Sequence, residues 1–505
     1  MTSTIPAAVA GAAAAFGATP ALVDAERLTY DQLLQAVRDV ARALIAEGLQ
    51  PGDRLALWAP NSAQWMLTAL GASYAGAVLV PINTRFTGVE ALDIVRRSQA
   101  RALVVVGPFL GTDRLAALRA AAGEEGVPLP RLVVRLPSDW AGFLARGAAV
   151  AEAEADARAA AVAPDDVADI LFTSGTTGRS KGVMSAHRQS LAVAAAWAGI
   201  AGLTPDDRYL VVNPFFNSFG LKAGILACLV SGATVVPQAV FDVPRTAALI
   251  GAERITVLPG PPTLYTSLMD HPDAAGHDLS SLRLAVTGAA TVPPALVERM
   301  RKELGADVLT AYGLTEAVVA TMCRPGDDAR IVAETCGRAA AGFEVRIGEP
   351  GGEVLLRGPN RMLGYLDDPA ATADAVDPEG WLHTGDLGRL DERGYLTITD
   401  RLKDMFICGG FNVYPAEVER ALAHLPGVAE SAVIGVADAR LGEVGKAYVV
   451  CRPGRALTGP EVIEFCRGRL AGYKVPRSVE LRAELPHNAS GKVLKYLLRA
   501  EAADA

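Results

Sequence analysis

Helical patterns and short apolar runs alternate along most of this chain, and that alternation limits its fold more than any other feature. Over Tyr30–Ala46, leucine, valine and alanine recur at helical spacing. The runs at 53–58, 77–81 and 102–106 are short and mostly apolar, which is typical of strands buried on both faces. The same rhythm resumes over 169–347. Helices that alternate with such strands predict an α/β fold with parallel sheets.

The pattern changes twice towards the C-terminus. Residues 353–357 and 396–399 resemble antiparallel strands with glycine-containing turns, which predicts a β-rich part. After residue 400 a separate apolar pattern begins, long enough for a small α+β domain. We therefore expect a large N-terminal domain of βα subdomains over 1–400 and a small, mobile C-terminal domain over 401–505.

Charge, hydropathy and cysteine use exclude several classes of protein. The 48 basic and 56 acidic residues form no basic patch, which argues against nucleic-acid binding. No stretch offers about 18 consecutive strongly apolar residues, so no membrane span is expected. No Lys or Arg precedes Arg27, which favours an opening amphipathic helix over a signal peptide. The six cysteines are scattered without a CxxC pair, and we expect a reducing, cytoplasmic location.

The segment DILFTSGTTGRSKGV, residues 169–183, carries the clearest chemical signal. After an apolar strand it presents glycines, hydroxyls and a lysine: Thr173, Ser174, Gly175, Thr176, Thr177, Gly178, Arg179, Ser180, Lys181 and Gly182. Glycines allow a tight loop whose N–H groups point at an anion, and the hydroxyls and the lysine add donors and positive charge. The spacing differs from the Walker A pattern. We interpret the segment as a loop that binds a triphosphate with Mg²⁺.

This segment resembles the signature of the adenylate-forming superfamily, which includes acyl-CoA synthetases, the adenylation domains of peptide synthetases, and luciferases. Five further stretches match in the family's order: TGAATVP (287–293), AYGLTE (311–316), WLHTGD (381–386), TDRLKDMFICGGFNVYPAEVE (399–419) and LPHNASGKVLK (485–495). The resemblance covers nearly the whole chain. It implies that ATP and an acid form an acyl-adenylate, followed by transfer to a thiol.

The resemblance implies a role for each nucleotide-binding motif. The loop 173–181 would hold the β- and γ-phosphates, Glu316 the Mg²⁺, and the Thr315 hydroxyl the α-phosphate. A surface ion-pair partner is the alternative role for Glu316. Asp386 would bind the ribose hydroxyls, with Arg401 assisting. The adenine pocket would consist of Gly288, Ala289, Ala290, Tyr312 and Gly313, with Tyr312 stacked on the ring.

The C-terminal motifs imply a catalytic lysine and a hinge. Lys492 matches the family's lysine that bridges the attacking carboxylate and the α-phosphate. Lys403, within 400–403, occupies the hinge about which the small domain would swing between the two half-reactions. Asn412 matches a polar residue that assists adenylation, and Gly409 and Gly410 would line a tunnel for coenzyme A. A homodimer is compatible with such an enzyme.

One motif departs from the family. Many members carry PFFHxFG, in which the histidine lies beside the carboxylate, whereas this chain has Phe216 followed by Asn217. Asparagine donates a hydrogen bond but cannot become cationic. Lys222 is also unexpected in an otherwise apolar wall. It is either a surface lysine whose stem covers apolar atoms or a contact to a polar group of the substrate.

Longer runs suggest a substrate: DILFTSGTTGRSKGV (169–183), KAGILACL (222–229), ITVLPGPPTLY (255–265), AVTGAATVP (285–293) and RLKDMFICGGFNVYPAEVE (401–419). They resemble actinobacterial CoA ligases that activate the propionate left on the steroid C and D rings, an activity of steroid catabolism. A compact apolar pocket would consist of Val257, Pro259, Pro262, Ala317, Val318 and Val319, beside Phe216, Asn217 and Lys222. Because of Asn217 we keep an alternative, an ATP-dependent diazotase that activates nitrite for attack by an aryl amine. A second alternative is a nucleotide-binding pseudo-enzyme, against which the intact Lys492, Glu316 and Asp386 argue.

Overall fold

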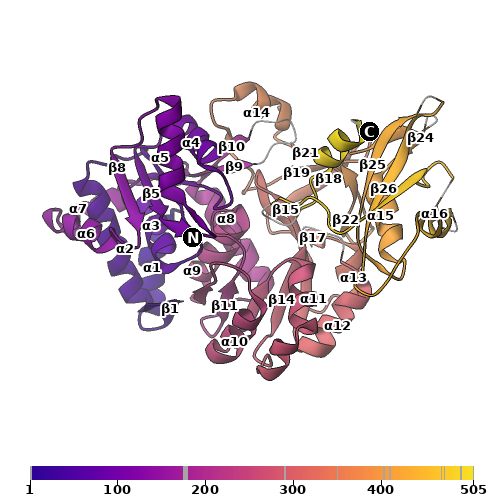
Figure 1. Cartoon of the computed structure of the whole chain (residues 1–505). Coiled ribbons are helices and arrows are strands. Elements are labelled where there is room, and N and C mark those ends of the chain that lie inside the picture. The colour runs from indigo at the N-terminus through magenta and orange to yellow at the C-terminus, as the bar shows by residue number, and fades with distance from the viewer. Residues whose placement is uncertain are drawn as a thin grey trace.

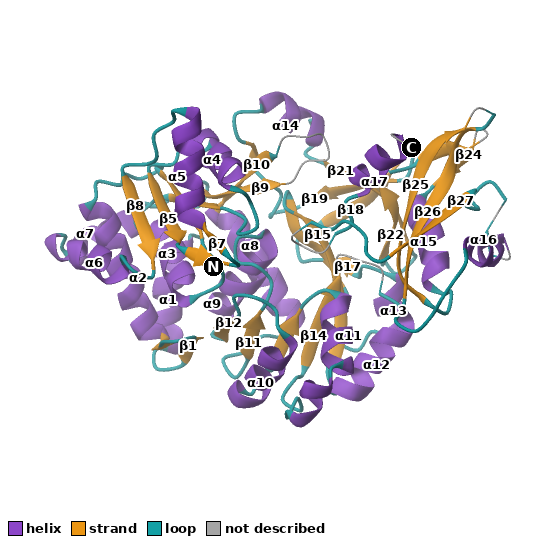
Figure 2. Ribbon diagram, in the orientation of Figure 1, coloured by secondary structure: helices purple, strands orange, loops and turns teal. Residues whose placement is uncertain are grey.

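The computed structural model describes most of the chain, namely residues 3–173, 180–288, 292–349, 351–401, 404–408, 411–438, 440–467, 469–470, 472–488 and 492–503. For residues 275, 400, 401, 411 and 412 it describes the backbone alone. Figure 1 shows two large sheets in the N-terminal part, with helices between and around them, and the last hundred residues at one end. Figure 2 shows the same arrangement by element type.

The first large sheet has seven strands in the order β20-β10-β9-β4-β3-β5-β8. Their bounds are β20 (Gly364–Tyr365), β10 (Lys181–Ala186), β9 (Val167–Thr173), β4 (Val78–Pro81), β3 (Arg54–Trp58), β5 (Ala102–Val106) and β8 (Leu132–Leu136). Strands β9, β4, β3, β5 and β8 are parallel, whereas β10 and β20 are antiparallel to their neighbours. The parallel sheet expected from the three apolar runs is therefore confirmed, with those runs as β3, β4 and β5.

The second large sheet has nine strands in the order β17-β16-β15-β14-β13-β11-β12-β1-β2. Their bounds are β17 (Arg338–Ala339), β16 (Ala317–Met322), β15 (Asp307–Leu314), β14 (Leu284–Gly288), β13 (Val257–Pro259), β11 (Arg208–Val211), β12 (Thr234–Pro237), β1 (Pro20–Val23) and β2 (Arg27–Thr29). The central strands from β15 to β1 are all parallel. A small hairpin, β6 (Pro108–Phe109) with β7 (Thr112–Asp113), lies apart from both sheets.

The helices of the N-terminal part connect these strands. They are α1 (Ile5–Phe16), α2 (Tyr30–Ala46), α3 (Ala63–Tyr74), α4 (Gly88–Arg97), α5 (Arg114–Glu125), α6 (Trp140–Arg146), η1 (Gly147–Ala149), α7 (Glu152–Ala161), α8 (His187–Ala201), η2 (Phe219–Leu226), α9 (Ala227–Ser231), α10 (Val243–Glu253), α11 (Pro262–Asp270), η3 (Pro272–Gly276), α12 (Pro294–Leu304), α13 (Ala329–Glu334) and α14 (Pro369–Ala375). The helix predicted over Tyr30–Ala46 is confirmed with the same bounds. It begins at Tyr30 because Thr29 and Gln32 form a capping box there. Among the described residues, no helix is both long and apolar enough to cross a membrane.

The hydrophobic core has two main layers, one on each face of the seven-stranded sheet. On one face, α4 and α5 place Leu92 and Leu118 against Val80 and Leu103 of the sheet. On the other, a larger cluster includes residues of α1, α2, α3 and α8 together with residues of the nine-stranded sheet. The two sheets thus share one continuous core, which fixes their facing edges relative to each other.

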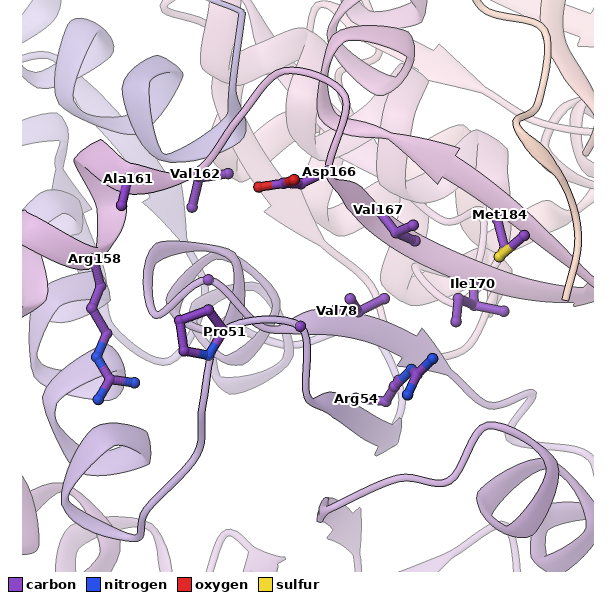
Figure 3. Close-up of a pocket in the computed structure, with 12 residues that line it drawn as sticks. Pro51, Arg54, Val78, Arg158, Ala161, Val162, Asp166, Val167, Ile170 and Met184 are labelled. Atoms are coloured by element: carbon purple, nitrogen blue, oxygen red, sulfur yellow. The ribbon is translucent and has the colours of Figure 1, made fainter.

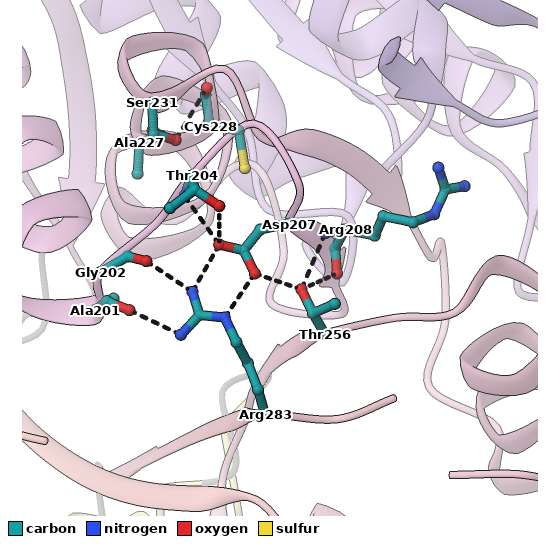
Figure 4. A network of polar contacts seen from close by, with 10 residues as sticks. All are labelled: Ala201, Gly202, Thr204, Asp207, Arg208, Ala227, Cys228, Ser231, Thr256 and Arg283. Carbon is teal, nitrogen blue, oxygen red and sulfur yellow. Dashed lines mark hydrogen bonds and ion pairs between the residues drawn. The ribbon is translucent and has the colours of Figure 1, made fainter. Parts of the chain in front are cut away.

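A buried polar network secures the amino ends of the parallel strands β11, β13 and β14 (Figure 4). Arg283 donates to both carboxylate oxygens of Asp207 at 2.6 Å and to the carbonyls of Ala201 and Gly202 at the end of α8. Thr256 Oγ1 donates to Asp207 Oδ1 at 2.7 Å. Burial opposes the charge of Asp207, but these hydrogen bonds outweigh it and lower its pKa. The network therefore makes a rigid base at the edge of the sheet opposite to the carboxyl ends of these strands.

The remaining strands form two smaller sheets. The β-rich part is the antiparallel sheet of β18 (Glu344–Gly348), β19 (Glu353–Arg357), β21 (Leu382–Leu390) and β22 (Leu396–Arg401). The last unit comprises β23 (Phe406–Cys408), β24 (Phe411–Val413), α15 (Pro415–Ala423), β25 (Val428–Asp438), β26 (Gly442–Cys451), α16 (Gly459–Arg467), β27 (Ser478–Arg482) and α17 (Lys495–Ala503). Arg420 of α15 donates to the carbonyls of Ile398 and Thr399, so α15 packs against β22.

His187, the first residue of α8, is buried, and we expect it to make the protein less stable in acid. Its side chain is 2% exposed, and its Nδ1 accepts a hydrogen bond from the Ile5 N–H at 3.3 Å. Burial lowers the pKa of His187 to about 4, although Asp169 and Asp166 oppose the shift. Below pH 6.5 the unfolded chain therefore binds a proton that the folded chain does not. We expect this difference to lower the unfolding free energy by about 2 kcal/mol between pH 7 and pH 5.

Urea unfolding at the two pH values measures this effect. His187→Asn keeps an acceptor for the Ile5 N–H but removes the titrating ring, so the difference between pH 7 and pH 5 should shrink by about 2 kcal/mol. His424→Asn, at an exposed position, is the matched control and should leave the difference unchanged. An equal pH dependence in His187→Asn and the parent protein would contradict the prediction.

Candidate active site

The carboxyl ends of four parallel strands bring most of the predicted site residues to one edge of the nine-stranded sheet. Strands β11, β13, β14 and β15 are consecutive neighbours and run in the same direction. The segment with Asn217 follows β11, Pro259 ends β13, Gly288 ends β14, and Glu316 follows β15. The carboxyl ends of parallel strands are where open α/β sheets bind ligands. Ala289 and Ala290 lie outside the described residues.

The predicted phosphate loop joins two antiparallel strands. Thr173 ends β9 and Lys181 begins β10, and the two residues are register partners. The Thr173 hydroxyl donates to the Lys181 carbonyl at 3.3 Å, which closes the base of the hairpin. Ser174, Gly175, Thr176, Thr177 and Gly178 lie outside the described residues. The described part therefore places the two ends of the loop together.

Tyr365 lies between Lys181 and Glu316, and the sequence motifs did not identify it. Its hydroxyl donates to Glu316 Oε1 at 2.8 Å, and the Lys181 ammonium lies 4.7 Å from the centre of its ring. Tyr365 belongs to β20, and its register partner is Val183 of β10. The only signal in the sequence is a Gly-Tyr pair in the stretch RMLGYLDDP. Its pairing with a strand about 180 residues earlier could not be read from that stretch.

The surroundings of Glu316 are suited to a hard cation. Among the described side chains no basic group forms an ion pair with Glu316, which argues against the surface ion-pair alternative. No cluster of three or more metal-ligating side chains occurs in the described part of the chain. Mg²⁺ is typically held by one or two carboxylates together with substrate phosphates and water. A single carboxylate that shares Tyr365 with Lys181, at the end of the predicted phosphate loop, fits that requirement.

The residues predicted to bind adenosine are in contact. The Tyr312 hydroxyl donates to Asp386 Oδ2 at 2.6 Å, and Asp386 is 3% exposed. Asp386 of β21 is the register partner of Arg401 on β22, which places the two residues side by side. Gly313 is required by close packing, because a Cβ there would lie 2.5 Å from the Val319 nitrogen. The Thr287 hydroxyl, next to Gly288, is buried without a hydrogen bond to described atoms.

Two unusual backbone segments occur where the acyl pocket is predicted. The segment η2, which begins two residues after Asn217, is a π-helix, a form often found at functional sites. It contacts β16, where Val319 has a φ of 56°. This left-handed conformation is strained for a β-branched residue. Asn360, 5% exposed, supports the strained strand by donating to the Val318 carbonyl at 2.7 Å.

The other residues predicted for the pocket lie on or near other elements. Phe216 is nearly buried and Asn217 is half-buried, and Val257 is fully buried in β13. Strand β13 is separated from β16 by β14 and β15. Pro262 begins α11. Ala317, Val318 and Val319 are thus consecutive residues of β16, whereas Val257 and Pro259 lie on β13, with two strands between them.

Lys222 requires a correction. It is 2% exposed, so the interpretation as a surface lysine is wrong. Its ammonium lies 3.0 Å from Asp169 Oδ1 and donates to the Ser185 hydroxyl at 2.7 Å. Ser190 Oγ donates to Asp169 Oδ2 at 2.9 Å. The charge of Lys222 is therefore balanced inside the protein rather than presented to a substrate.

The C-terminal site residues lie on the last unit. Lys492 is exposed, and its N–H donates to Asn488 Oδ1 at 2.9 Å. Asn412 is on β24, opposite Ile407 of β23. Lys403, Gly409 and Gly410 lie outside the described residues. Lys492 is thus carried by a different sheet unit from Glu316, Tyr312 and Asp386.

A cavity of about 360 Å³ opens elsewhere, at the amino ends of β3, β4 and β9 (Figure 3). Arg54, Val78, Asp166 and Val167 line it. Because the phosphate hairpin follows the carboxyl end of β9, this cavity lies at the opposite edge of the sheet. It therefore does not belong to the site described above.

Comparison with known proteins gives two family matches. The family described as "AMP-binding enzyme" matches residues 9–366, and "AMP-binding enzyme C-terminal domain" matches residues 417–492. Together they include both the phosphate hairpin and Lys492.

Individual relatives match over nearly the full length. A protein of Rhodococcus jostii is 59% identical over 99% of each chain, and one of Mycobacterium tuberculosis is 58% identical over 95% of each. Both are named 3-[(3aS,4S,7aS)-7a-methyl-1,5-dioxo-octahydro-1H-inden-4-yl]propanoyl:CoA ligase. Among solved structures, ATP-bound MatB from Rhodopseudomonas palustris superposes with a TM-score of 0.88 at 32% identity, covering 99% of both chains.

Proposed function

The chain belongs to the AMP-binding enzyme family and is an AMP-forming acyl-CoA ligase, and we propose that its acid is a bicyclic propanoate. The observation that carries the proposal is the identity of 59% across 99% of both chains with a ligase named for such an acid. The octahydro-indene of that name is a fused six- and five-membered ring pair, which corresponds to the C and D rings of a steroid. The proposed substrate therefore combines a compact apolar body with one carboxylate.

In the first half-reaction a carboxylate oxygen attacks the α-phosphorus of ATP, the acyl–phosphate bond forms, and pyrophosphate leaves. The loop 173–181 would hold the β- and γ-phosphates, and Glu316 would hold Mg²⁺, which neutralises phosphate charge when bound. Thr315 would contact the α-phosphate. Gly288, Ala289, Ala290, Tyr312 and Gly313 would bind adenine, and Asp386 with Arg401 would bind the ribose. Most of the catalysis then consists of positioning.

The C-terminal domain would supply the remaining charge. Lys492 would place one ammonium between the carboxylate and the α-phosphate, where negative charge builds up. In the second half-reaction the thiol sulfur of coenzyme A attacks the acyl carbon, and AMP leaves. We propose that the unit over 401–505 rotates about residues 400–403, with Lys403 in the hinge, so that the same site serves both steps. Asn412 would then assist the adenylation step.

The acyl side of the site is consistent with a rigid, apolar acid. The buried side chains of Ala317, Val318 and Val319 would contact the ring system, and Phe216 would close the pocket. Asn217 would donate a hydrogen bond to the carboxylate without adding charge. Val319 keeps its strained conformation because the surrounding structure holds it, and we propose that a backbone fixed in this way favours a compact ring system over a flexible chain.

Pyrophosphate exchange with a panel of acids tests the proposed substrate. We expect exchange with the bicyclic propanoate of the relatives' name and at least about tenfold slower exchange with a straight-chain acid of equal carbon number, because a rigid apolar pocket discriminates shape. A matched comparison uses the bicyclic acid with an acetate in place of the propanoate chain. Exchange with nitrite but not with the ring propanoate would instead support the diazotase. No exchange with any acid would support the pseudo-enzyme.

A further inference from the structure

A short segment connects the phosphate hairpin with the Glu316 turn, and we call residues 361–366 the strap. Its Met362 N–H donates to the Glu316 carbonyl at 2.7 Å. Its Leu363 and Leu366 N–H groups donate to the carbonyls of Met184 and Gly182 at 2.9 and 2.7 Å. These bonds fix both the hairpin and the turn to one strand, so the separation between Lys181 and Glu316 is set by the strap.

The side chain of Tyr365 lies between Lys181 and Glu316 and contacts both. Its hydroxyl donates to Glu316, while the Lys181 ammonium lies over its ring. Among the described side chains, neither Lys181 nor Glu316 forms an ion pair.

The separation has a physical consequence for nucleotide binding. A lysine and a glutamate close to each other attract strongly in a partly buried site. A direct pair would neutralise the lysine that the phosphates need and the carboxylate that the metal needs. The ring of Tyr365 offers the cation a favourable π face instead, and its hydroxyl offers the carboxylate one donor while leaving the second oxygen for a metal.

We propose that Tyr365 is a positioning residue that keeps Lys181 and Glu316 apart and directs both toward the Mg²⁺-triphosphate. This inference rests on the proposed function only in that the site binds ATP with Mg²⁺. It does not depend on which acid is activated. No contact of Tyr365 with the reacting atoms is needed.

Nucleotide affinity, measured by calorimetry without any acid, tests the proposal. Tyr365→Phe keeps the ring under Lys181 but loses the bond to Glu316. We expect its affinity for ATP with Mg²⁺ to fall about tenfold, as for a lost hydrogen bond to a charged group. Its affinity for ATP with EDTA should stay within about twofold of the parent protein, because the lysine remains separated.

Removing the aromatic ring tests the separation of Lys181 from Glu316 directly. Tyr365→Leu should lose affinity about tenfold even with EDTA, because Lys181 can then pair with Glu316. Adding Glu316→Gln to Tyr365→Leu should restore the affinity in EDTA, since the competing carboxylate is gone. Restoration by a second substitution is not expected if Tyr365 only supports folding.

Controls separate this proposal from the proposed function. Tyr74→Phe removes another phenol–carboxylate bond, from Tyr74 to Asp156 at 2.6 Å, and should change neither affinity. Equal affinities of Tyr365→Phe and the parent for ATP with Mg²⁺ would overturn the proposal, as would failure of Glu316→Gln to rescue Tyr365→Leu. If the parent binds ATP but activates no acid, the proposed function fails while the role of Tyr365 still stands.

Discussion

Replacing Lys492 with alanine should reduce the adenylation rate at least about 100-fold, the largest effect on activity that we expect from one substitution. The ammonium would stabilise charge that builds up only as the carboxylate attacks the α-phosphorus. An exposed side chain can be removed with little effect on folding. Pyrophosphate exchange with the ring propanoate measures the adenylation rate.

Nucleotide binding should behave differently in the same variant. The residues proposed to bind ATP, apart from Lys492, all precede residue 402 in the chain, so the affinity for ATP should change less than about threefold. Lys302→Ala removes another exposed lysine and is the matched control, with exchange expected to stay at the parent rate. Unchanged exchange in Lys492→Ala would remove Lys492 from the mechanism.

Replacing Lys222 with methionine should lower the unfolding free energy by about 3–5 kcal/mol, the largest expected effect on stability. The substitution leaves Asp169 charged and buried, with both side chains of the pair 2% exposed in the parent. It also removes the hydrogen bond that the Lys222 ammonium donates to the Ser185 hydroxyl. Because Asp169 lies on the strand that leads into the phosphate loop, the hairpin should be among the segments that loosen.

A double substitution distinguishes an unpaired charge from simple loss of packing. Lys222→Met combined with Asp169→Leu leaves no buried charge, and we expect it to recover more than half of the lost stability. Arg330→Met breaks an exposed ion pair with Glu334, in which the arginine side chain is 81% exposed, and should cost less than about 0.5 kcal/mol. Urea unfolding compares all four proteins. Lys222→Met within about 0.5 kcal/mol of the parent would show that the pair contributes little.

Local patterns in the sequence were enough to predict the elements and the class of fold. The helix over Tyr30–Ala46 and the strands β3, β4 and β5 follow from periodicity within fewer than twenty residues. The phosphate loop was predicted from the residue types of one short run, and the other nucleotide motifs were implied by the resemblance to the adenylate-forming superfamily. Periodicity does not say which strands are neighbours, and the order of the two large sheets came only from the structure.

Contacts between distant segments could not be predicted from any run of residues. Tyr365 meets Glu316 and Lys181 only because β20 pairs with β10. Lys222 was expected at the surface or at the substrate, and its true partner, Asp169, lies 53 positions earlier in the sequence. A charged side chain in an apolar run signals a buried partner, but not which one.

The sequence by itself determined the family through its short motifs and the βα order through its local periodicity, and it predicted the residues for ATP. Only the tertiary structure decided which charges meet. The separation of Lys181 from Glu316 by Tyr365 and the burial of the Lys222–Asp169 pair are both set by strand pairing and packing across long stretches of chain. In a partly buried site the energy of a charge depends mainly on its immediate neighbours, and those neighbours are chosen by the fold.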